Sequence, residues 1–184
     1  TSQKMLEDIA AEHRKGRFLL VGTTNLDAQR PVIWDIGALA NSGRPDALQL
    51  MRKIILASAS IPGALPPVEI KVAANGKSYD EMHVDGGVTR QVFLYPPGFE
   101  PETIDKALGW KPVRRAFIIR NSKVAPEFAV TKAKLFPIAA RSISTLIKTQ
   151  GVGDLYQIYL TAKRDRVDYN LAYIPGEFAL QSKS

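Results

Sequence analysis

Apolar residues recur at helical spacing in two stretches of the first sixty residues. The first stretch follows Ser2, a residue type favoured at helix N-caps, and precedes Gly16, which suits the position just after a helix; its apolar residues are Met5, Leu6, Ile9 and Ala10. The second stretch begins at Pro45 and must end at Ile61-Pro62-Gly63; its stripe is Leu48, Met51, Ile54, Ile55 and Ser58. Two helices are therefore predicted, one opening the chain and one over residues 45–60.

Alternating or continuous apolar runs predict strands in the remainder of the chain. Residues 18–26 and 31–36 read as a hairpin joined through residues 27–29, and residues 68–72 and 79–84 as another, because Asn75-Gly76 is a strong two-residue turn signal. Residues 115–121 read as a buried strand and residues 167–173 as a last, alternating strand. Residues 95–101 predict a rigid loop, and residues 137–150 and 154–164 two helices. This interleaving predicts an α/β fold of three layers with a mixed central sheet.

The composition limits the chemistry that the chain can perform. The 184 residues include no Cys, which excludes disulfides, thiolate zinc sites, iron–sulfur clusters and a cysteine nucleophile. The apolar and charged fractions are those of an ordinary globular domain, and no apolar run is long enough to span a bilayer. Residues 1–15 contain no apolar segment of the kind found in signal peptides, and the residues leave the compartment open. One domain over residues 1–184 is expected.

Charge is distributed unevenly between the two parts of the chain. Residues 1–110 carry a formal charge of −1 and residues 111–184 a charge of +8. The basic part is either a solvated surface or a footprint for an anionic membrane, with Tyr156 and Tyr159 as candidate contacts. Nucleic acid is not expected as a partner, because no aromatic platform or base-reading motif accompanies the dispersed Lys and Arg residues.

Residues 80–85 form the densest polar cluster. In a strand, Met82 and Val84 would face the core, and Glu81, His83 and Asp85 would share the opposite face. That face can be a solvated strand surface or a metal-binding triad. Alternatively, Asp85 is a general base, because two glycines follow it and allow a sharp turn and a close approach of the backbone.

Four segments together favour the last of these alternatives. The segments are Thr23-Thr24-Asn25-Leu26-Asp27, Arg30-Pro31-Val32-Ile33-Trp34-Asp35, Ala57-Ser58-Ala59-Ser60-Ile61-Pro62-Gly63 with Pro66-Pro67, and Asp85-Gly86-Gly87. Their order and spacing resemble the later part of bacterial patatin-like phospholipases, over most of residues 3–95, and the basic segment up to Ile174-Pro175 is similar to the tail of that family.

The resemblance implies a serine lipid acyl hydrolase that acts through a Ser–Asp dyad, without a metal or other cofactor. Asp85 would be its catalytic base, Gly86 and Gly87 would shape the turn that presents it, and residues 60–63 would form a wall of the cleft. His83 is then not required, and Ser58 and Ser60 are expected to line the cleft or to pack. Phospholipids or other acyl esters are the implied substrates, and export or membrane association in bacteria is the implied setting.

The chain departs from this family because it contains no Gly-x-Ser-x-Gly segment and no glycine-rich oxyanion loop. The nucleophile is therefore expected on an upstream segment or on a second chain, and residues 1–184, the C-terminal portion of one hydrolase domain, are predicted to be inactive alone. Without that segment the strands at residues 18–21 and 116–119 would expose apolar edges, so a stable isolate should need a partner. A non-catalytic lipid-binding or scaffold remnant is the alternative, and Thr1 as an N-terminal nucleophile is a rival enzyme class.

Overall fold

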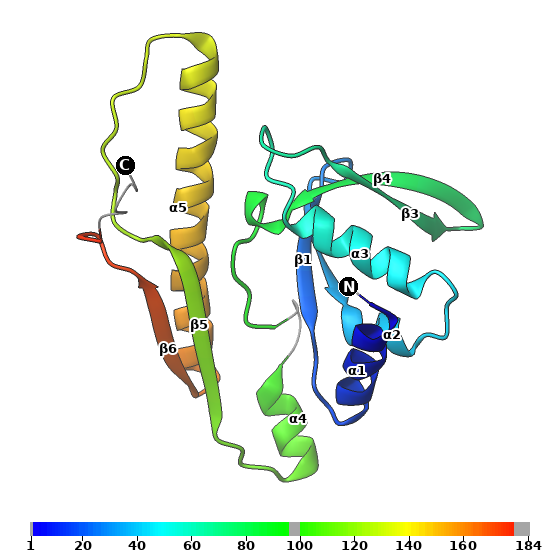
Figure 1. Cartoon of the computed structure of the whole chain (residues 1–184). Helices are drawn as coiled ribbons and strands as arrows, with labels where there is room; N and C mark the ends of the chain where they lie inside the picture. The colour runs from blue at the N-terminus through cyan, green and yellow to red at the C-terminus, as the bar shows by residue number, and fades with distance from the viewer. Residues whose placement is uncertain (1, 96–99, 179–184) are drawn as a thin grey trace. The chain divides into compact units, whose positions relative to one another are not determined.

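A computed structural model describes residues 2–95 and 100–178 of the chain (Figure 1). The chain divides into two compact units, Thr1–Gln91 and Val92–Ser184. Each unit has its own sheet and its own hydrophobic core. Thr1 and residues 96–99, which include most of the predicted rigid loop, lie outside the described residues.

The first unit is a four-stranded antiparallel sheet with helices on one face (Figure 1). The strand order is β2-β1-β4-β3. Its elements are α1 (Gln3–Arg14), β1 (Leu20–Asn25), β2 (Arg30–Asp35), α2 (Ile36–Asn41), α3 (Ala47–Ser58), β3 (Val68–Ala74), β4 (Lys77–Asp85) and a 3-10 turn, η1 (Gly86–Val88).

The core of this unit joins the three helices to the sheet. Met51 and Ile54 of α3 are fully buried against Ile70 of β3 and Ile36 of α2. Ile55, which belongs to the predicted stripe, is exposed. Helix α3 buries Ala47 and Ala57 beside Met51 and Ile54 in its place. Burial of these side chains is the main favourable contribution to the stability of the unit.

The short-range signals in the sequence predict the ends of these elements correctly. Ser2 caps α1 by accepting a hydrogen bond from the Met5 amide, and Gly16 follows the helix in the left-handed region. Asn75 and Gly76 both have positive φ, as a two-residue turn between paired strands requires. Helix α2 was not predicted, although its cap is local: the Asp35 carboxylate accepts from the Ala38 amide.

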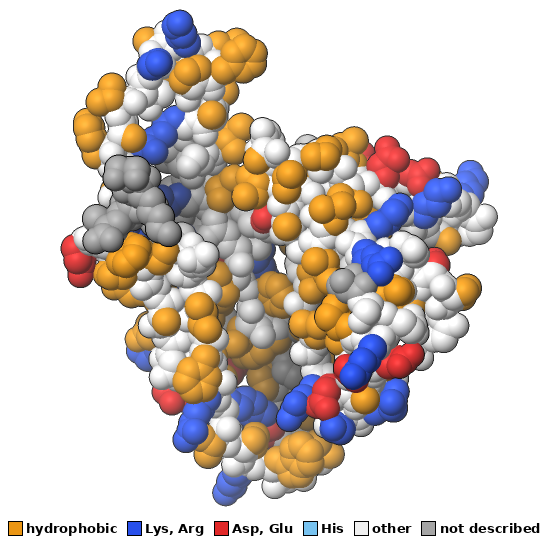
Figure 2. Space-filling model, viewed as in Figure 1, with side chains coloured by type: hydrophobic (Ala, Val, Ile, Leu, Met, Phe, Trp, Pro, Cys, Tyr) orange, Lys and Arg blue, Asp and Glu red, His pale blue; other side chains and the backbone are white. Residues whose placement is uncertain are grey.

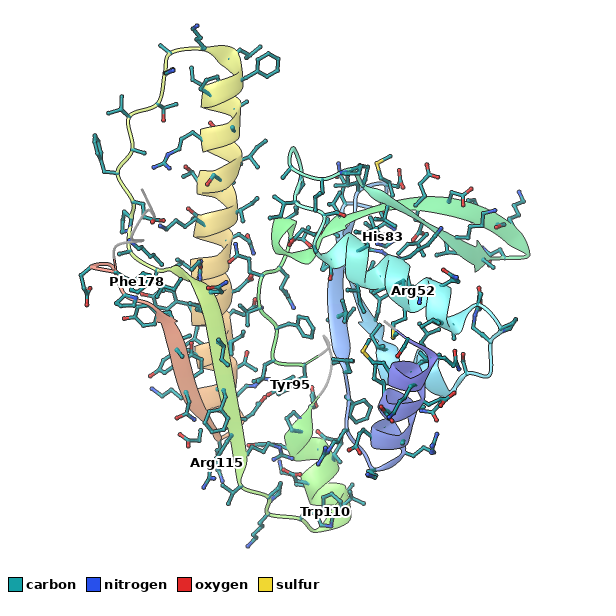
Figure 3. All side chains as sticks on the ribbon, in the orientation of Figure 1. Arg52, His83, Tyr95, Trp110, Arg115 and Phe178 are labelled. Carbon is teal, nitrogen blue, oxygen red and sulfur yellow. The ribbon has the colours of Figure 1, made fainter. Side chains whose placement is uncertain are left out.

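The predicted orientation of β4 is wrong. Strand β4 pairs with β3 so that His83 lies opposite Val68, and Val68 belongs to the face that packs on the helices. His83, labelled in Figure 3, is fully buried there. Met82 is exposed, and Val84 is buried outside the helix-covered core. Glu81, His83 and Asp85 therefore share the helix-covered face, not a solvated one.

The second unit pairs two parallel strands and packs them on a long helix. Its elements are α4 (Pro101–Leu108), β5 (Arg114–Lys123), α5 (Leu135–Arg164) and β6 (Val167–Ile174). Leu155 and Ile158 of α5 bury Ala116 and Ile118 of β5 in its core. The last strand is confirmed, with one more residue than predicted.

Two predictions for this unit need correction. The two helices predicted at residues 137–150 and 154–164 are one helix, because the Gly151-Val152-Gly153 segment continues the helix and Gly151 is buried in it. The strand at residues 115–121 is not buried on both faces. Ala116 and Ile118 are buried, but Phe117 and Ile119 on the other face are 72% and 85% exposed.

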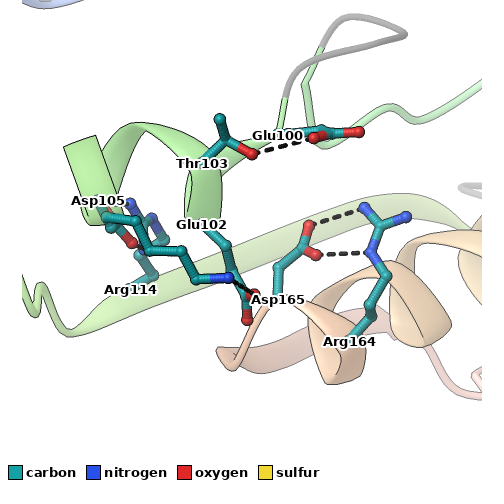
Figure 4. A network of polar contacts seen from close by, with 8 residues as sticks. Glu100, Glu102, Thr103, Asp105, Arg114, Arg164 and Asp165 are labelled. Carbon is teal, nitrogen blue, oxygen red and sulfur yellow. Dashed lines mark hydrogen bonds and ion pairs between the residues drawn. The ribbon is translucent and has the colours of Figure 1, made fainter.

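Polar contacts within this unit join α4 to the start of β5, and others order the connection between α5 and β6 (Figure 4). Arg114 at the start of β5 makes two hydrogen bonds to the Asp105 carboxylate of α4, and Arg164 makes two to Asp165. The Tyr95 hydroxyl also donates to Asp165. Burial, together with this bond to a carboxylate, raises the pKa of Tyr95 to about 12, and Arg164 lowers the pKa of Asp165.

The mixed α/β class is confirmed, but the described strands form two sheets, one antiparallel and one parallel, in place of a single mixed sheet. Among residues 2–95 and 100–178, none of the helices has the length and apolar character needed to cross a membrane.

Candidate active site

Asp85 is the last residue of β4, and its backbone is held from two sides. Its amide donates a hydrogen bond to the Ser60 carbonyl, at 3.0 Å, in the segment that follows α3. Its carbonyl accepts a 3.0 Å hydrogen bond from the Thr24 hydroxyl of β1. The Thr89 hydroxyl lies 2.9 Å from that of Thr24 and donates to it, because the single proton of Thr24 is already used. Asp85 is thus fixed where β4 leaves the sheet.

The Asp85 carboxylate is oriented by the turn that follows it. Its Oδ1 accepts a hydrogen bond from the Gly87 amide at 2.6 Å, which caps the η1 turn. No residue of the described chain makes a hydrogen bond to the other oxygen, Oδ2. The carboxylate is half-buried, so this oxygen remains available to accept a proton from a group brought beside it.

A side chain on either of the two glycines after Asp85 would crowd a neighbouring atom. A Cβ on Gly86 would come within 2.7 Å of the Gly22 carbonyl oxygen on β1. A Cβ on Gly87 would come within 2.9 Å of the Asp85 Oδ1 atom. Gly86 therefore permits the turn to pass close to the sheet, and Gly87 permits the short bond that orients the carboxylate.

The polar residues of β1 and the loop after it hold the same end of the sheet together. The Asn25 side chain accepts from the Ala28 amide and shapes the β1–β2 loop. The Asp27 carboxylate accepts from the Met82 amide, and the Leu26 amide donates to the Met82 carbonyl. These contacts extend the pairing of β1 with β4 beyond the three residue pairs of the regular ladder.

His83 lies two residues before Asp85 but has a separate environment. The Trp34 indole donates to the Thr23 hydroxyl at 2.8 Å, and this hydroxyl lies 2.9 Å from the His83 Nδ1 atom. The Thr23 hydroxyl accepts the indole proton and has both a proton and a second lone pair to offer, so it can pair with Nδ1 in either tautomer of a neutral imidazole. Burial lowers the pKa of His83, against an opposing effect of Glu81. His83 is therefore a neutral core residue.

The metal triad finds no support in this geometry. Glu81 Oε2 lies 3.4 Å from His83 Nε2. Within the part of the chain that the structure describes, no three Asp, Glu or His residues are grouped so that they could hold a metal ion.

The two serines near Asp85 are occupied elsewhere. The Ser60 hydroxyl donates to the Leu56 carbonyl and the Ser58 hydroxyl to the Ile55 carbonyl, and both carbonyls belong to α3. Neither makes a hydrogen bond to the Asp85 carboxylate. Ser60 acts on the site through its main chain, which binds the Asp85 amide.

Thr24 is the site residue that sequence reasoning missed. It appears in the Thr23–Asp27 segment, but its partner is 61 residues away along the chain. Nothing local distinguishes it from Thr23, whose hydroxyl points to the opposite face of the sheet.

Comparisons with family models, with curated proteins and with solved structures find no match to this chain.

Proposed function

We propose that residues 1–184 are the C-terminal portion of a patatin-like serine lipid acyl hydrolase domain, with Asp85 as its catalytic base. Its substrates would be phospholipids or other acyl esters. The nucleophilic serine and the oxyanion donors would come from a segment upstream of Thr1 or from a second chain. The chain alone would be inactive.

The observation that carries this proposal is the convergence of distant segments on Asp85. Two other segments that carry the family resemblance reach Asp85 through Thr24 and Ser60, whereas Trp34 of the remaining segment bonds to Thr23. Thr24 and Ser60 bind the Asp85 carbonyl and amide, and Gly86 lets the turn approach β1. An ordinary Asp-Gly-Gly turn does not need support from two other segments.

The proposed reaction uses Asp85 as both base and acid. As the serine Oγ attacks the ester carbonyl carbon, its proton passes to Asp85 Oδ2. The proton then passes to the leaving alkoxide, and the carbon–oxygen bond to that group breaks. Water attacks the acyl-serine in the second half of the cycle and gives a proton to Asp85. The bond between the acyl carbon and Oγ then breaks, Asp85 returns the proton to Oγ, and the fatty acid leaves.

Each unit leaves strand surface on which such a segment could dock. Only Thr23, Thr24 and Asn25 of β1 pair with β4, so Leu20–Gly22 are paired on the β2 side alone among the described strands. Strand β5 pairs only with β6 in the described chain, and its bare face carries Phe117 and Ile119. An upstream segment that adds a strand beside Leu20–Gly22 would pair their free backbone groups, and one that packs on Phe117 and Ile119 would cover apolar surface that is costly to leave in water.

Ester hydrolysis by the parent polypeptide tests the assignment of Asp85. The parent is expected to hydrolyse a soluble chromogenic acyl ester, and Asp85→Asn is expected to lower kcat by about 100-fold or more. Asp80→Asn is the matched control, because Asp80 is an exposed carboxylate on the same strand, and it should leave kcat unchanged. EDTA should have no effect.

Two results would contradict the proposal. If the parent carries no serine that hydrolyses esters, the chain is a non-catalytic lipid-binding or scaffold remnant of the fold. If the parent is active but Asp85→Asn retains full kcat, the base lies elsewhere.

A further inference from the structure

The first half of α5 extends beyond the core of its own unit. All its buried residues lie between Gly151 and Ala162, and none lies in the sixteen residues 135–150. At 1.5 Å per residue this half spans about 24 Å. Residues 124–134 run back along it, so that residues 128–150 form a projecting arm (Figure 1).

The arm exposes an apolar stripe on its helix. Leu135, Ala139, Ile143 and Leu146 follow one another at spacings of four, four and three residues, which places them on one side of a helix. Leu135, Phe136 and Leu146 are 77%, 84% and 69% exposed. Phe128 and Val130, in the segment that leads to the helix, are also almost fully exposed.

The opposite side of the same helix is polar and is already used. Arg141 donates to the Glu127 carbonyl, and Lys148 lies 2.9 Å from the Glu127 carboxylate. Together with Ser144 and Thr145 they line a cavity of about 610 Å³ against residues 124–127. The helix therefore turns its polar side to its own chain and its apolar side outward. A helix that packs on the core of a globular protein has the opposite orientation.

The arm carries an excess of positive charge, of which Lys148 is paired with Glu127 and the lysines at its free end are not paired with another described residue. Residues 128–153 contain four Lys or Arg residues and no Asp or Glu. Lys132 and Lys134 stand at the free end of the arm, are exposed, and form no ion pair with other described residues. Figure 2 shows Lys or Arg side chains and hydrophobic side chains together at this end.

We propose that the arm is a membrane-interface element that binds anionic lipid surfaces. An apolar stripe of Leu, Ile and Phe flanked by Lys is the signature of helices that lie in the headgroup region, where the apolar side chains reach the acyl boundary and the cations meet lipid phosphates. Uncompensated cations favour an anionic bilayer over a protein partner as the cover of this stripe. The role of this binding, which is to bring the enzyme to lipid esters, rests on the proposed function. Binding to the lipid surface does not itself require catalysis.

Vesicle flotation of the full chain tests the proposal. The chain is expected to float with phosphatidylcholine vesicles that contain phosphatidylglycerol, weakly with phosphatidylcholine alone, and less in high salt. Lys132→Glu combined with Lys134→Glu should lower the partition coefficient about tenfold or more, and Phe136→Ser with Leu146→Ser should lower it comparably. All four residues are at the surface, so the fold should persist, as circular dichroism would verify.

Matched controls come from the same unit outside the arm. Lys111→Glu with Lys163→Glu makes the same change in net charge, and Trp110→Ser with Val113→Ser removes exposed apolar side chains; both pairs should retain binding. Equal losses in these controls, binding that ignores anionic lipid, or arm variants that float like the original chain would overturn the proposal. Failure here would leave hydrolysis of a soluble ester by the parent intact, whereas failure of the proposed hydrolase would leave flotation intact.

Discussion

Replacing Gly86 by Ala tests the packing that presents Asp85. The new Cβ would meet the Gly22 carbonyl oxygen at 2.7 Å and the Gly22 carbonyl carbon at 2.9 Å. Both atoms belong to the backbone of β1 at Gly22, which pairs with Ile33 of β2, so neither can move without disturbing that pairing.

The expected loss of stability depends on whether the new Cβ contacts backbone or side-chain atoms. Overpacking that forces a backbone shift costs about 1–3 kcal/mol, and a contact with sheet backbone belongs to the upper part of that range. In Gly87→Ala the nearest atoms are the Asp85 Oδ1 at 2.9 Å and the Gln91 Cγ at 3.3 Å, both on side chains that can move. We expect Gly87→Ala to cost less than about 1 kcal/mol in stability but to displace the carboxylate.

Tryptophan fluorescence can measure these losses in the first unit alone. The chain has two Trp residues, Trp34 in the first unit and Trp110 in the second. In a Trp110→Phe background, urea unfolding followed by Trp34 reports the unit that contains Asp85. Gly76→Ala is the control that separates backbone strain from a steric contact. Gly76 has a φ of +74°, which strains a residue with a side chain, but an added Cβ has no atom within 4 Å.

The reasoning would be refuted if Gly86→Ala unfolded at the same urea concentration as its parent. It would also be refuted if Gly86→Ala and Gly87→Ala lost equal stability, because the distinction between backbone and side-chain contacts would then have no consequence.

Three further predictions concern other parts of the chain. Burial lowers the pKa of His83 from its usual 6.5, so the unfolded state binds more protons than the folded state below that pH. The free energy of unfolding should therefore fall on acidification through about pH 6.5, by at most about 1.4 kcal/mol per pH unit. Urea titrations at several pH values should show this slope, and His83→Gln should flatten it. Gly153→Ala, exposed and without neighbours inside α5, should raise the thermal stability of the second unit by about 0.5–1 kcal/mol in calorimetry, whereas a loss would show that the helix is broken there. Ultraviolet titration should find one tyrosine with a pKa of about 12 that Tyr95→Phe removes and Asp165→Asn shifts downward; a Tyr95→Phe curve identical to the original would contradict the Tyr95–Asp165 bond.

Local chemistry made part of the fold predictable. The N-cap at Ser2 and the turn at Asn75-Gly76 depend on residues within three positions of each other, and both are where the sequence predicts them. The α5 helix was divided wrongly because its two glycines resemble a break, whereas Gly151 is buried where the helix packs. Packing offsets the intrinsic cost of glycine in a helix, and packing is not visible in a local pattern.

The orientation of β4 failed for a related reason. Polar residues are expected to face solvent, but the His83 Nδ1 atom has a partner in the core, the hydroxyl of Thr23, sixty positions away, and Thr23 in turn accepts from Trp34. Asp85 could be named as a candidate from sequence because its motif and each companion segment are runs of adjacent residues. The support from Thr24 and Ser60 could not, since it depends on the pairing of β1 with β4 and on the end of α3.

Fluorophosphonate labelling followed by denaturing mass spectrometry tests the central claim most directly, because it reports every polypeptide present and which of them carries a reactive serine. The account predicts that the 20.3 kDa chain by itself stays unlabelled, that an upstream segment or a second chain takes the label, and that Asp85→Asn slows this labelling strongly while Asp80→Asn does not. Labelling of Ser58 or Ser60 in this chain, or equal labelling rates with and without the Asp85 carboxylate, would contradict it.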